Sequence, residues 1–412
     1  MSLEMEPSSD ISSTTPEEQF RQKIRSFRTS QYAHSAQDRE SITETESESA
    51  VRAKKFQKAL AKAGLAGIVY PKQFGGAGLS EIHQEIFNQE VADWDLPNTP
   101  LSISLGMCLP MLNKFGTSQQ KVRFMPDLIK GNTIWCQLFS EPGAGSDVAS
   151  LATRATRDGN EWILEGQKVW TSGAHYCDYG LVVARTDPTQ PKHQGLSMFI
   201  VNLRQTNIDI RRLRQISGGS GFNEVFFNEA RIPVEYQIGE LGHGWNLALA
   251  MLMFERVSLG AGGGPLNVDR SPELIRSAQE FKCNTDPLVR QQLADLWLRE
   301  QIRKFISARI RTAAAARNVP GPEGSLAKLN ASLLARRVRD VSLTIAGASS
   351  QAWDPKDAEA DRWSISCISA AGISLAGGTD AVQRNIIGER VLGLPKDPDP
   401  YKGIAWQNIP RS

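Results

Sequence analysis

One glutamate stands in an otherwise apolar stretch of the sequence. Between Trp245 and Gly260 the only charged side chains belong to Glu255 and Arg256. A carboxylate in a buried helix is costly unless it is paired or functional. Adjacent residues of a helix do not face each other, so Arg256 is not the expected partner. Glu255 is therefore either part of an ion pair with another helix or a general base whose pKa is set by apolar surroundings.

A second group of residues with chemical potential lies in the segment Phe139–Asp147, which reads Phe-Ser-Glu-Pro-Gly-Ala-Gly-Ser-Asp. The proline and glycines favour a loop whose backbone N–H groups can face a ligand. Ser140 and Ser146 add hydroxyls that both donate and accept hydrogen bonds. A plain turn between strands explains the same spacing equally well.

The segment Gly166–Gly173 places Trp170 directly before the hydroxyls of Thr171 and Ser172. A flat apolar ring beside hydrogen-bonding groups suits a planar heteroaromatic cofactor. The alternative is a tryptophan at the end of a strand that fills the core, and for this motif alone the alternative is the better interpretation.

Paired glycines precede the last expected helix, in the segment Leu375–Pro395. Gly377 and Gly378 let the backbone approach a ligand, and N–H donors are exposed where a helix begins. The alternative is an ordinary loop followed by a helix start.

Several other function classes lack their sequence signals. No dinucleotide-binding or phosphate-binding glycine motif occurs, and the five histidines have no ligand spacing, so no metal site is expected. A net charge of +2 gives no indication of the strongly basic surface that nucleic-acid binding requires. No stretch is long and apolar enough for a membrane span or a secretory signal. Five cysteines without a Cys-x-x-Cys pair favour a reducing compartment, which we take to be the cytoplasm.

These motifs must be positioned by elements that change type twice along the chain. We expect a disordered N-terminus (1–15), a helical domain (16–133), a middle β domain (134–240) and a second helical domain (241–412). Short runs separated by turn residues in the middle predict an antiparallel sandwich or barrel, and Trp245–Gly260, apolar on every face, predicts a fully buried helix. Helices followed by strands and helices indicate an α+β protein of several domains.

Together the four segments resemble the acyl-CoA dehydrogenase family over about Phe20–Pro395. The resemblance implies that FAD lies between the β domain and the C-terminal helices. The positions that match flavin-lining residues of the family are Gln137, Phe139, Ser140, Ser146, Trp170, Thr171, Ser172 and Thr379. Ser146, Arg256 and Gly377 match positions that contact the acyl-CoA substrate.

The catalytic base of the family occurs in two places. Many members have a glutamate directly before the Gly-Thr of the last motif, where this sequence has Gly377. The isovaleryl and long-chain members have it on the helix after the β domain, where Glu255 stands. The resemblance implies that Glu255 takes the α proton of an acyl-CoA while the β hydride moves to flavin N5, giving a trans-2-enoyl-CoA. A backbone N–H at Gly377 and a ribityl hydroxyl of FAD would stabilise the enolate, and an electron-transfer flavoprotein would reoxidise the flavin.

The sequence departs from the family at the flavin contacts between subunits. Many members carry an Arg-x-x-Phe-Gly segment after the base helix, and Asn267–Asn284 contains none. Family members are usually homodimers or homotetramers, but here a partner chain of a hetero-oligomer could complete the site. Two alternatives to a dehydrogenase remain: an acyl-CoA oxidase that uses oxygen, and a subunit that binds FAD poorly. Gly377 frees space beside the flavin, which favours a branched, long or bulky acyl chain.

Overall fold

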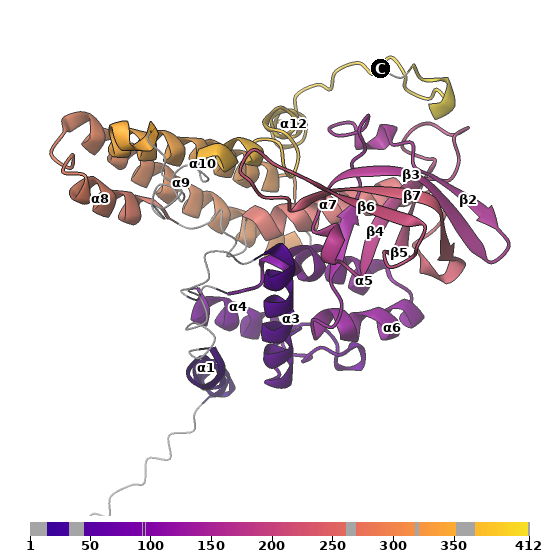
Figure 1. Ribbon diagram of the computed structural model, residues 1–412, viewed down its shortest axis with the longest axis horizontal. Helices are drawn as coiled ribbons and strands as arrows, with labels where there is room; N and C mark the ends of the chain where they lie inside the picture. The colour runs from indigo at the N-terminus through magenta and orange to yellow at the C-terminus, as the bar shows by residue number, and fades with distance from the viewer. Residues whose placement is uncertain are drawn as a thin grey trace, which may run out of the picture.

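The computed structural model describes residues 15–32, 45–92, 94, 96–260, 269–317, 321–351 and 367–410. Helices from both ends of the chain pack against a β-sheet (Figure 1). In that view the N-terminal helices lie below the sheet and the C-terminal helices extend to its left, with α7 (Gly244–Gly260) between them. This arrangement confirms the predicted α+β fold class of two helical parts around a β part.

The N-terminal part begins at a capped helix, as the sequence predicts for Pro16. Its helices are α1 (Pro16–Phe27), α3 (Glu46–Lys62), α4 (Glu81–Glu90), α5 (Leu109–Phe115) and α6 (Ser118–Ile129). The acidic residues Glu46 and Glu48 lie in the first turn of α3, where Glu48 is exposed to solvent. Thr45 caps α3, and its N–H donates to the Glu48 carboxylate at 2.8 Å. Acidic groups here face the positive end of the helix dipole.

The middle part is an eight-stranded sheet with the order β6-β7-β3-β2-β4-β5-β8, and β1 pairs with β4. The strands are β1 (Trp135–Leu138), β2 (Arg154–Asp158), β3 (Glu161–Ser172), β4 (Tyr179–Arg185), β5 (Leu196–Asn202), β6 (Ile208–Leu213), β7 (Phe222–Pro233) and β8 (Gln237–Ile238). Most pairings are antiparallel, as expected, but β4 pairs in parallel with β1 and β2. Strands β3 and β7 form a long antiparallel pair, and the Gly166–Gly173 motif lies at the C-terminal end of β3.

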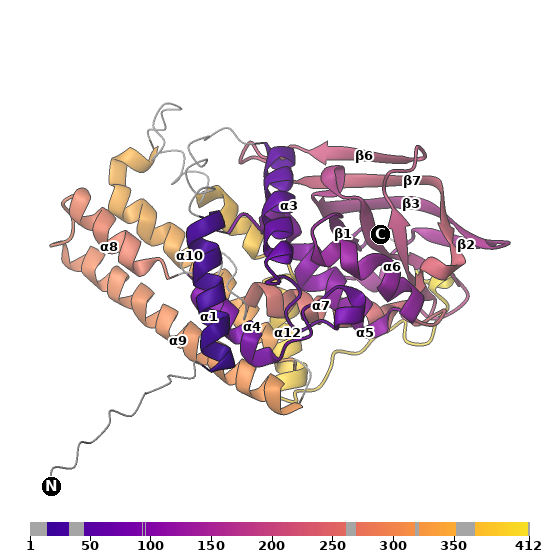
Figure 2. The ribbon, with the colours of Figure 1, turned by 90° about the horizontal axis from the view of Figure 1, so that it is seen from below.

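The C-terminal part consists of long helices and a short final one. They are α7, α8 (Ser271–Glu280), α9 (Pro287–Arg317), α10 (Gly324–Ala346) and α12 (Asp380–Ile386), which continues as a π-helical turn, Ile387–Val391. The glycine-rich run at 262–265 lies outside the described residues, as does most of the helix predicted over 360–375, of which residues 367–373 are helical. Figure 2 shows α8, α9 and α10 on one side of the molecule and α3 beside β6 on the other.

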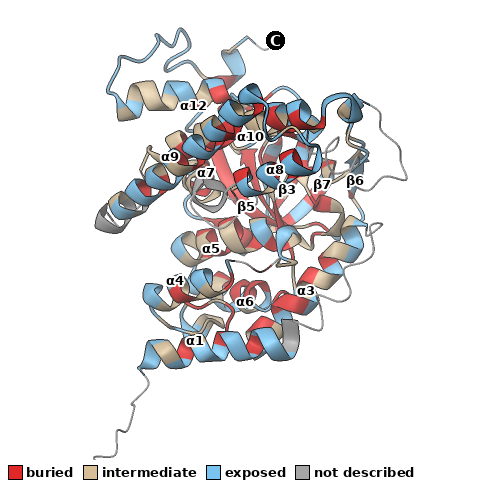
Figure 3. Ribbon diagram, turned by 90° about the vertical axis from the view of Figure 1, so that its left-hand side faces the viewer, coloured by how far each residue is buried: buried red, intermediate tan, exposed pale blue. Residues whose placement is uncertain are grey.

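The apolar core does not follow the three-part division of the sequence. One cluster joins the N-terminal helices, the sheet and the buried side of α7, namely Leu247, Ala248 and Met251. A second cluster holds α8, α9 and α10 together. In Figure 3 the strands behind α8 and α10 are buried, whereas the outer sides of α1 and α9 carry exposed residues.

The expectation that α7 is fully buried was wrong. Met251 is completely buried, but Met253, Phe254 and Glu255 are only half-buried and Asn246 is exposed. The helix contacts β5, α5 and α10, and these neighbours cover only part of its surface. An apolar helix with an open side is typical of one that contacts a ligand or another chain.

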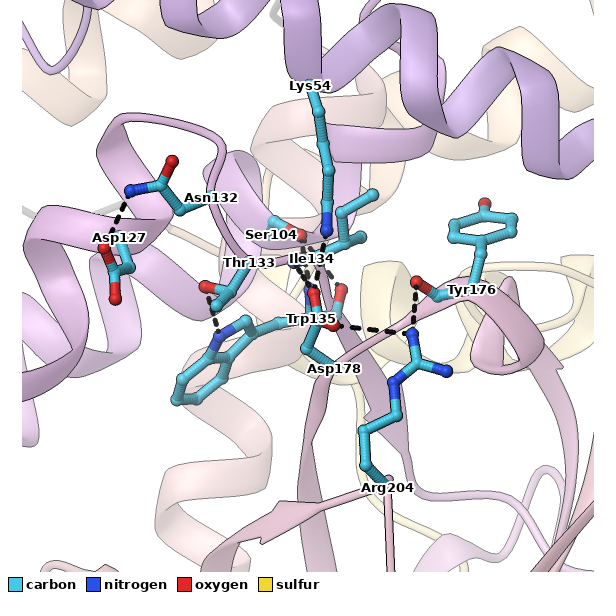
Figure 4. A network of polar contacts seen from close by, with 10 residues as sticks. All are labelled: Lys54, Ser104, Asp127, Asn132, Thr133, Ile134, Trp135, Tyr176, Asp178 and Arg204. Carbon is cyan, nitrogen blue, oxygen red and sulfur yellow. Dashed lines mark hydrogen bonds and ion pairs between the residues drawn. The ribbon is translucent and has the colours of Figure 1, made fainter.

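Polar contacts fix the N-terminal helices to the start of the sheet (Figure 4). Lys54 on α3 lies 3.0 Å from Asp178, and the same carboxylate accepts the N–H of Ile134 at 2.9 Å. The Ser104 hydroxyl accepts the N–H of Trp135 at 2.7 Å and donates to its carbonyl at 3.1 Å. These contacts set the position of β1, the strand that carries Gln137.

Candidate active site

A buried ion pair fastens the Phe139–Asp147 loop to the sheet. Lys168 on β3 is fully buried and donates to the Phe139 carbonyl at 2.9 Å and to the Glu141 carboxylate at 2.7 Å. The N–H groups of Ala152 and Thr153 also donate to that carboxylate, at 2.6 and 3.0 Å. The loop is therefore a rigid structure rather than a plain turn.

The same contacts set the charge of Glu141. Burial alone would raise the pKa of Glu141, but the Lys168 charge and the N–H donors outweigh burial and lower it. Within this motif Ser140 is half-buried, Ser146 is exposed and Phe139 belongs to the core at 5% exposure. Neither Glu141 nor Lys168 was predicted as a site residue, although both lie within the quoted motifs.

Trp170 lies at an irregularity of β3 and does not fill the core. Its side chain is 61% exposed and its backbone is left-handed, with a φ of 60°. The pairing with β7 shifts between Lys168 and Thr171, and the Phe222 ring packs edge-on against the indole at 6.0 Å. A bulky residue at positive φ is strained, and such strain is concentrated at functional sites. The core-filling alternative is therefore wrong for this tryptophan.

The residues after Trp170 turn back into the sheet. Thr171 is 2% exposed, and among the described residues its Oγ1 has no hydrogen-bond partner. Its carbonyl accepts from the Asn223 amide at 2.9 Å, and Ser172 is half-buried. Gln137, on the neighbouring β1, is half-buried in register with Leu181. The C-terminal end of β3 thus combines the exposed ring of Trp170 with the buried hydroxyl of Thr171 and the half-buried one of Ser172.

The paired glycines form a constrained loop in front of α12. Gly377 and Gly378 both have left-handed backbones, with φ of 64° and 85°. Thr379 is the N-cap, and its hydroxyl accepts the N–H of Val382 at 3.2 Å. The predicted helix start is therefore confirmed, and the loop before it has a conformation that favours glycine.

A charged group joins this loop to the helix of Glu255. Lys328 on α10 is 5% exposed, and its ammonium lies 3.4 Å from the carboxylate of Asp380, the first residue of α12. Burial lowers the pKa of Lys328, and the charges of Asp380 and Glu255 offset part of this lowering. The Lys328 cation thus pairs with Asp380 directly after the Gly377 loop, and its helix α10 packs against α7, the helix of Glu255.

Asp380 has a second cationic partner. Arg336, on the same helix as Lys328, lies 2.8 Å from its other carboxylate oxygen. Burial alone would raise the pKa of Asp380, but a Ser332 hydrogen bond and the two cations lower it overall. The side chain of Arg256, a predicted substrate contact, lies outside the described residues.

Other kinds of site find little support in the described part of the chain. No cluster of three or more His, Cys, Asp or Glu side chains there is arranged to hold a metal ion. No helix among the described residues is long and apolar enough to cross a membrane. A surface groove of about 550 Å³ lies between α6 and Tyr236, and none of the predicted site residues lines it.

Models of three consecutive protein domains match the chain. They are the N-terminal, middle and C-terminal domains of acyl-CoA dehydrogenase, over residues 14–132, 136–230 and 242–392. Acyl-CoA dehydrogenase IpdE1 of Mycobacterium tuberculosis is 36% identical over 343 residues, which cover 83% of this chain and 88% of that protein. This chain belongs to the acyl-CoA dehydrogenase family. It is an oxidoreductase, and enzymes of this family use FAD.

Solved structures of other acyl-CoA dehydrogenases have the same fold as this enzyme. The steroid acyl-CoA dehydrogenase Tcur3481-Tcur3483 is 26% identical, with a TM-score of 0.76 over 92% of this chain and 98% of that one. The ChsE4-ChsE5 complex of Mycobacterium tuberculosis is 27% identical, with a TM-score of 0.72 over 94% of this chain and 100% of that one. Both relatives carry two joined names, and the second is described as a complex.

Proposed function

We propose that this enzyme oxidises the α,β bond of an acyl-CoA thioester to a trans-2-enoyl-CoA, with Glu255 as the general base. The observation that carries the proposal is the half-buried Glu255 on the apolar helix α7, which packs against α10. Lys328 on α10 is in turn paired with Asp380, which follows the Gly377 loop at the start of α12. Of the two family positions for a base, only that of Glu255 holds a glutamate, because Gly377 has no side chain. A half-buried carboxylate among apolar side chains suits proton abstraction.

The chain's own groups divide the work of breaking two C–H bonds. Glu255 takes the weakly acidic α proton, and the electron pair left on the α carbon forms the new double bond as the β hydride leaves. The backbone N–H of Gly377 donates to the thioester oxygen and stabilises negative charge there. Bound FAD supplies the acceptor for the hydride, and its reduction balances the oxidation of the substrate.

The C-terminal end of β3, with Trp170 and Thr171, suits a flavin. The strained, solvent-facing ring of Trp170 and the unpartnered Thr171 hydroxyl are features that a planar polar cofactor would cover. Because Phe139 is buried, it would act through its backbone. The residues that we propose hold FAD are Gln137, Phe139, Ser140, Ser146, Trp170, Thr171, Ser172 and Thr379.

A bulky acyl chain is the substrate class that the site favours. Gly377 has no side chain, so the space that a glutamate would take beside the thioester is open to the acyl group. One of the similar solved structures is named a steroid acyl-CoA dehydrogenase, which agrees with this inference. Ser146, Arg256 and Gly377 are the proposed contacts of the acyl-CoA.

A stripe of apolar side chains on the outer side of α9 supports an oligomer. Leu298, Ile302 and Phe305 lie on one face of the helix and are 52%, 43% and 69% exposed. Such a stripe is typical of a helix that packs against another chain. We infer a homodimer, a homotetramer or a hetero-oligomer, and the two-chain names of the similar structures favour the last. A Phe305→Glu variant that keeps the wild-type mass in solution would contradict this interface.

The electron acceptor and the compartment complete the proposal. We expect an electron-transfer flavoprotein to reoxidise the enzyme; an oxidase would instead form one hydrogen peroxide for each enoyl-CoA. The cysteines Cys108, Cys136, Cys177, Cys283 and Cys367 are all free thiols, as suits the reducing cytoplasm.

Mass spectrometry of the products tests the proposed reaction. The purified enzyme is incubated with isovaleryl-, octanoyl- and cyclohexanecarbonyl-CoA and an artificial electron acceptor, and peroxide is measured in parallel without that acceptor. The proposal predicts loss of two mass units from one thioester and little peroxide. Stoichiometric peroxide would identify an oxidase. A colourless protein that binds no FAD, alone or with a partner chain, would identify a FAD-poor subunit.

A further inference from the structure

Gln383 holds the loop in front of α12 from inside the protein. It lies on the first turn of α12 and is fully buried. Its side chain reaches back toward the N-terminus, and its Nε2 donates to the carbonyl of Gly377 at 2.8 Å and to that of Gly378 at 3.4 Å. One side-chain amide therefore binds two consecutive peptide groups.

The orientation of this amide follows from its partners. Both are carbonyl oxygens, which only the NH2 end of a glutamine can satisfy. The other end, Oε1, is buried and has no hydrogen-bond partner among the described residues. A buried acceptor without a hydrogen bond costs free energy, and the two hydrogen bonds of the NH2 group offset this cost.

The loop needs such a restraint. Gly377 and Gly378 both have left-handed backbones. Glycine can adopt this conformation without strain, but it can adopt many others as easily, so glycine alone does not hold the loop in place. A Cβ atom on Gly378 would lie 2.6 Å from Gln383 Nε2, so the amide occupies the space beside the backbone. Any side chain at position 378 would therefore collide with the amide of Gln383.

The restraint also orients donors. In a trans peptide the carbonyl and the following N–H point in opposite directions. The two bound carbonyls therefore turn the N–H groups of Gly378 and Thr379 away from Gln383 and limit the rotation of Gly377. Within the described part of the chain, the N–H groups of Gly377 and Thr379 donate to no backbone carbonyl.

We propose that Gln383 is a positioning residue for the reaction: by clamping the carbonyls of Gly377 and Gly378 it holds the loop in the conformation in which the Gly377 N–H donates to the thioester oxygen of the acyl-CoA. This inference rests on the proposed function and extends it to a residue that touches neither substrate nor cofactor. Loss of the clamp weakens the stabilisation of the enolate without removing the base, Glu255. It therefore lowers kcat more than it changes KM.

Two variants separate the clamp from mere packing. Gln383→Leu keeps the volume and removes the donors. Gln383→Glu keeps the shape but donates only when protonated, so its activity should recover as pH falls. Asn385→Leu, at an exposed position of the same helix, is the matched control. Each is compared with the wild type in FAD content, melting temperature, kcat and KM, using the best thioester among isovaleryl-, octanoyl- and cyclohexanecarbonyl-CoA.

A second readout does not depend on turnover. The stretching band of a 13C-labelled thioester carbonyl is measured on the Glu255→Gln enzyme, with and without the change at Gln383. We expect a shift to lower frequency on binding that Gln383→Leu abolishes, together with a loss in kcat of about tenfold to a hundredfold in the enzyme that retains Glu255.

The outcomes distinguish this inference from the function on which it rests. A Gln383→Leu enzyme with wild-type kcat, or an unchanged carbonyl shift, would overturn the inference alone if Glu255→Gln is inactive. If Gln383→Leu fails to fold, a pH profile of Gln383→Glu identical to that of the wild type would overturn it. A fully active Glu255→Gln enzyme would overturn the proposed function and the inference together.

Discussion

The ammonium of Lys328 lies 3.4 Å from the carboxylate of Asp380, although the two residues are 52 positions apart in the sequence. This contact joins α10 to the first residue of α12, and the charge of Glu255 on α7 also acts on Lys328. The pair thus ties α12 and the Gly377 loop to α10, and α10 packs against α7, which carries the proposed base.

Replacing Lys328 by methionine should change the pH profile of the enzyme. Because the charges of Lys328 and Glu255 interact, removal of the cation should move the acid limb of kcat/KM to higher pH. The profile is measured from pH 5 to 9 beside that of Arg336→Met, which removes a partner of Asp380 but leaves Lys328 in place. Equal acid limbs in the two variants would show that Lys328 has no special effect on the base.

The buried pair of Glu141 and Lys168 should make a large contribution to stability. Breaking it with Lys168→Met leaves a buried carboxylate with only backbone donors, which should cost about 3–5 kcal/mol of unfolding free energy. Adding Glu141→Gln should recover part of this loss, because the second change removes the uncompensated charge. Denaturant unfolding of the four proteins of this cycle gives the coupling, and a value near zero would contradict the account.

The pair of Glu141 and Lys168 should also make the stability of the protein fall at acidic pH. The pKa of Glu141 is lowered in the folded protein, so its contribution to stability is present above its ordinary pKa of 4.5. That contribution is lost as pH falls from 4.5 through the lowered value, and the loss should be absent in the Glu141→Gln variant.

The strained backbone of Trp170 should lower the stability of the apoprotein, whereas its ring should strengthen FAD binding. A glycine at this position adopts a φ of 60° without strain, so Trp170→Gly should leave the apoprotein as stable as the wild type or more stable by about 1 kcal/mol. The same change removes the proposed face for the flavin and should weaken FAD binding at least tenfold. Calorimetry of the apoproteins and a FAD titration measure the two effects. Lower stability with unchanged FAD affinity would mean that the tryptophan only packs.

The C-terminal tail returns from α12 to the β domain (Figure 1), where Trp406 is fixed beside the loop of Ser146. Its indole Nε1 donates to the Ser150 carbonyl at 3.2 Å, and the Arg185 guanidinium lies 4.4 Å from the ring centroid. Trp406→Ala should loosen this loop and raise KM for acyl-CoA several-fold with little change in kcat. Tyr401→Ala, at an exposed position of the same tail, is the control and should behave as the wild type.

The sequence predicts features that depend on local pattern. The helix boundaries of α9 and the capped start at Pro16 follow from periodicity and end signals, and Glu255 is conspicuous because its neighbours are apolar. Features that depend on distant contacts were not predictable in this way. Lys328, Asp380 and Gln383 look like ordinary residues of polar helices until the fold places them together.

The middle of the chain shows the same limit. Strands β1 and β2 have no clear alternating pattern, because one is short and buried and the other is mostly exposed. The exposure of Trp170 contradicted the interpretation of its motif taken alone, since a tryptophan at a strand end is more often buried. Only its left-handed backbone distinguishes it, and no sequence pattern encodes that.

The most direct test of the account is an anaerobic titration that follows flavin absorbance as the preferred acyl-CoA is added to the wild type and to Glu255→Gln. The account predicts that the wild type bleaches in a single turnover, whereas Glu255→Gln binds the thioester but bleaches at least a hundredfold more slowly. Bleaching of Glu255→Gln at the wild-type rate would contradict the assignment of Glu255 as the base.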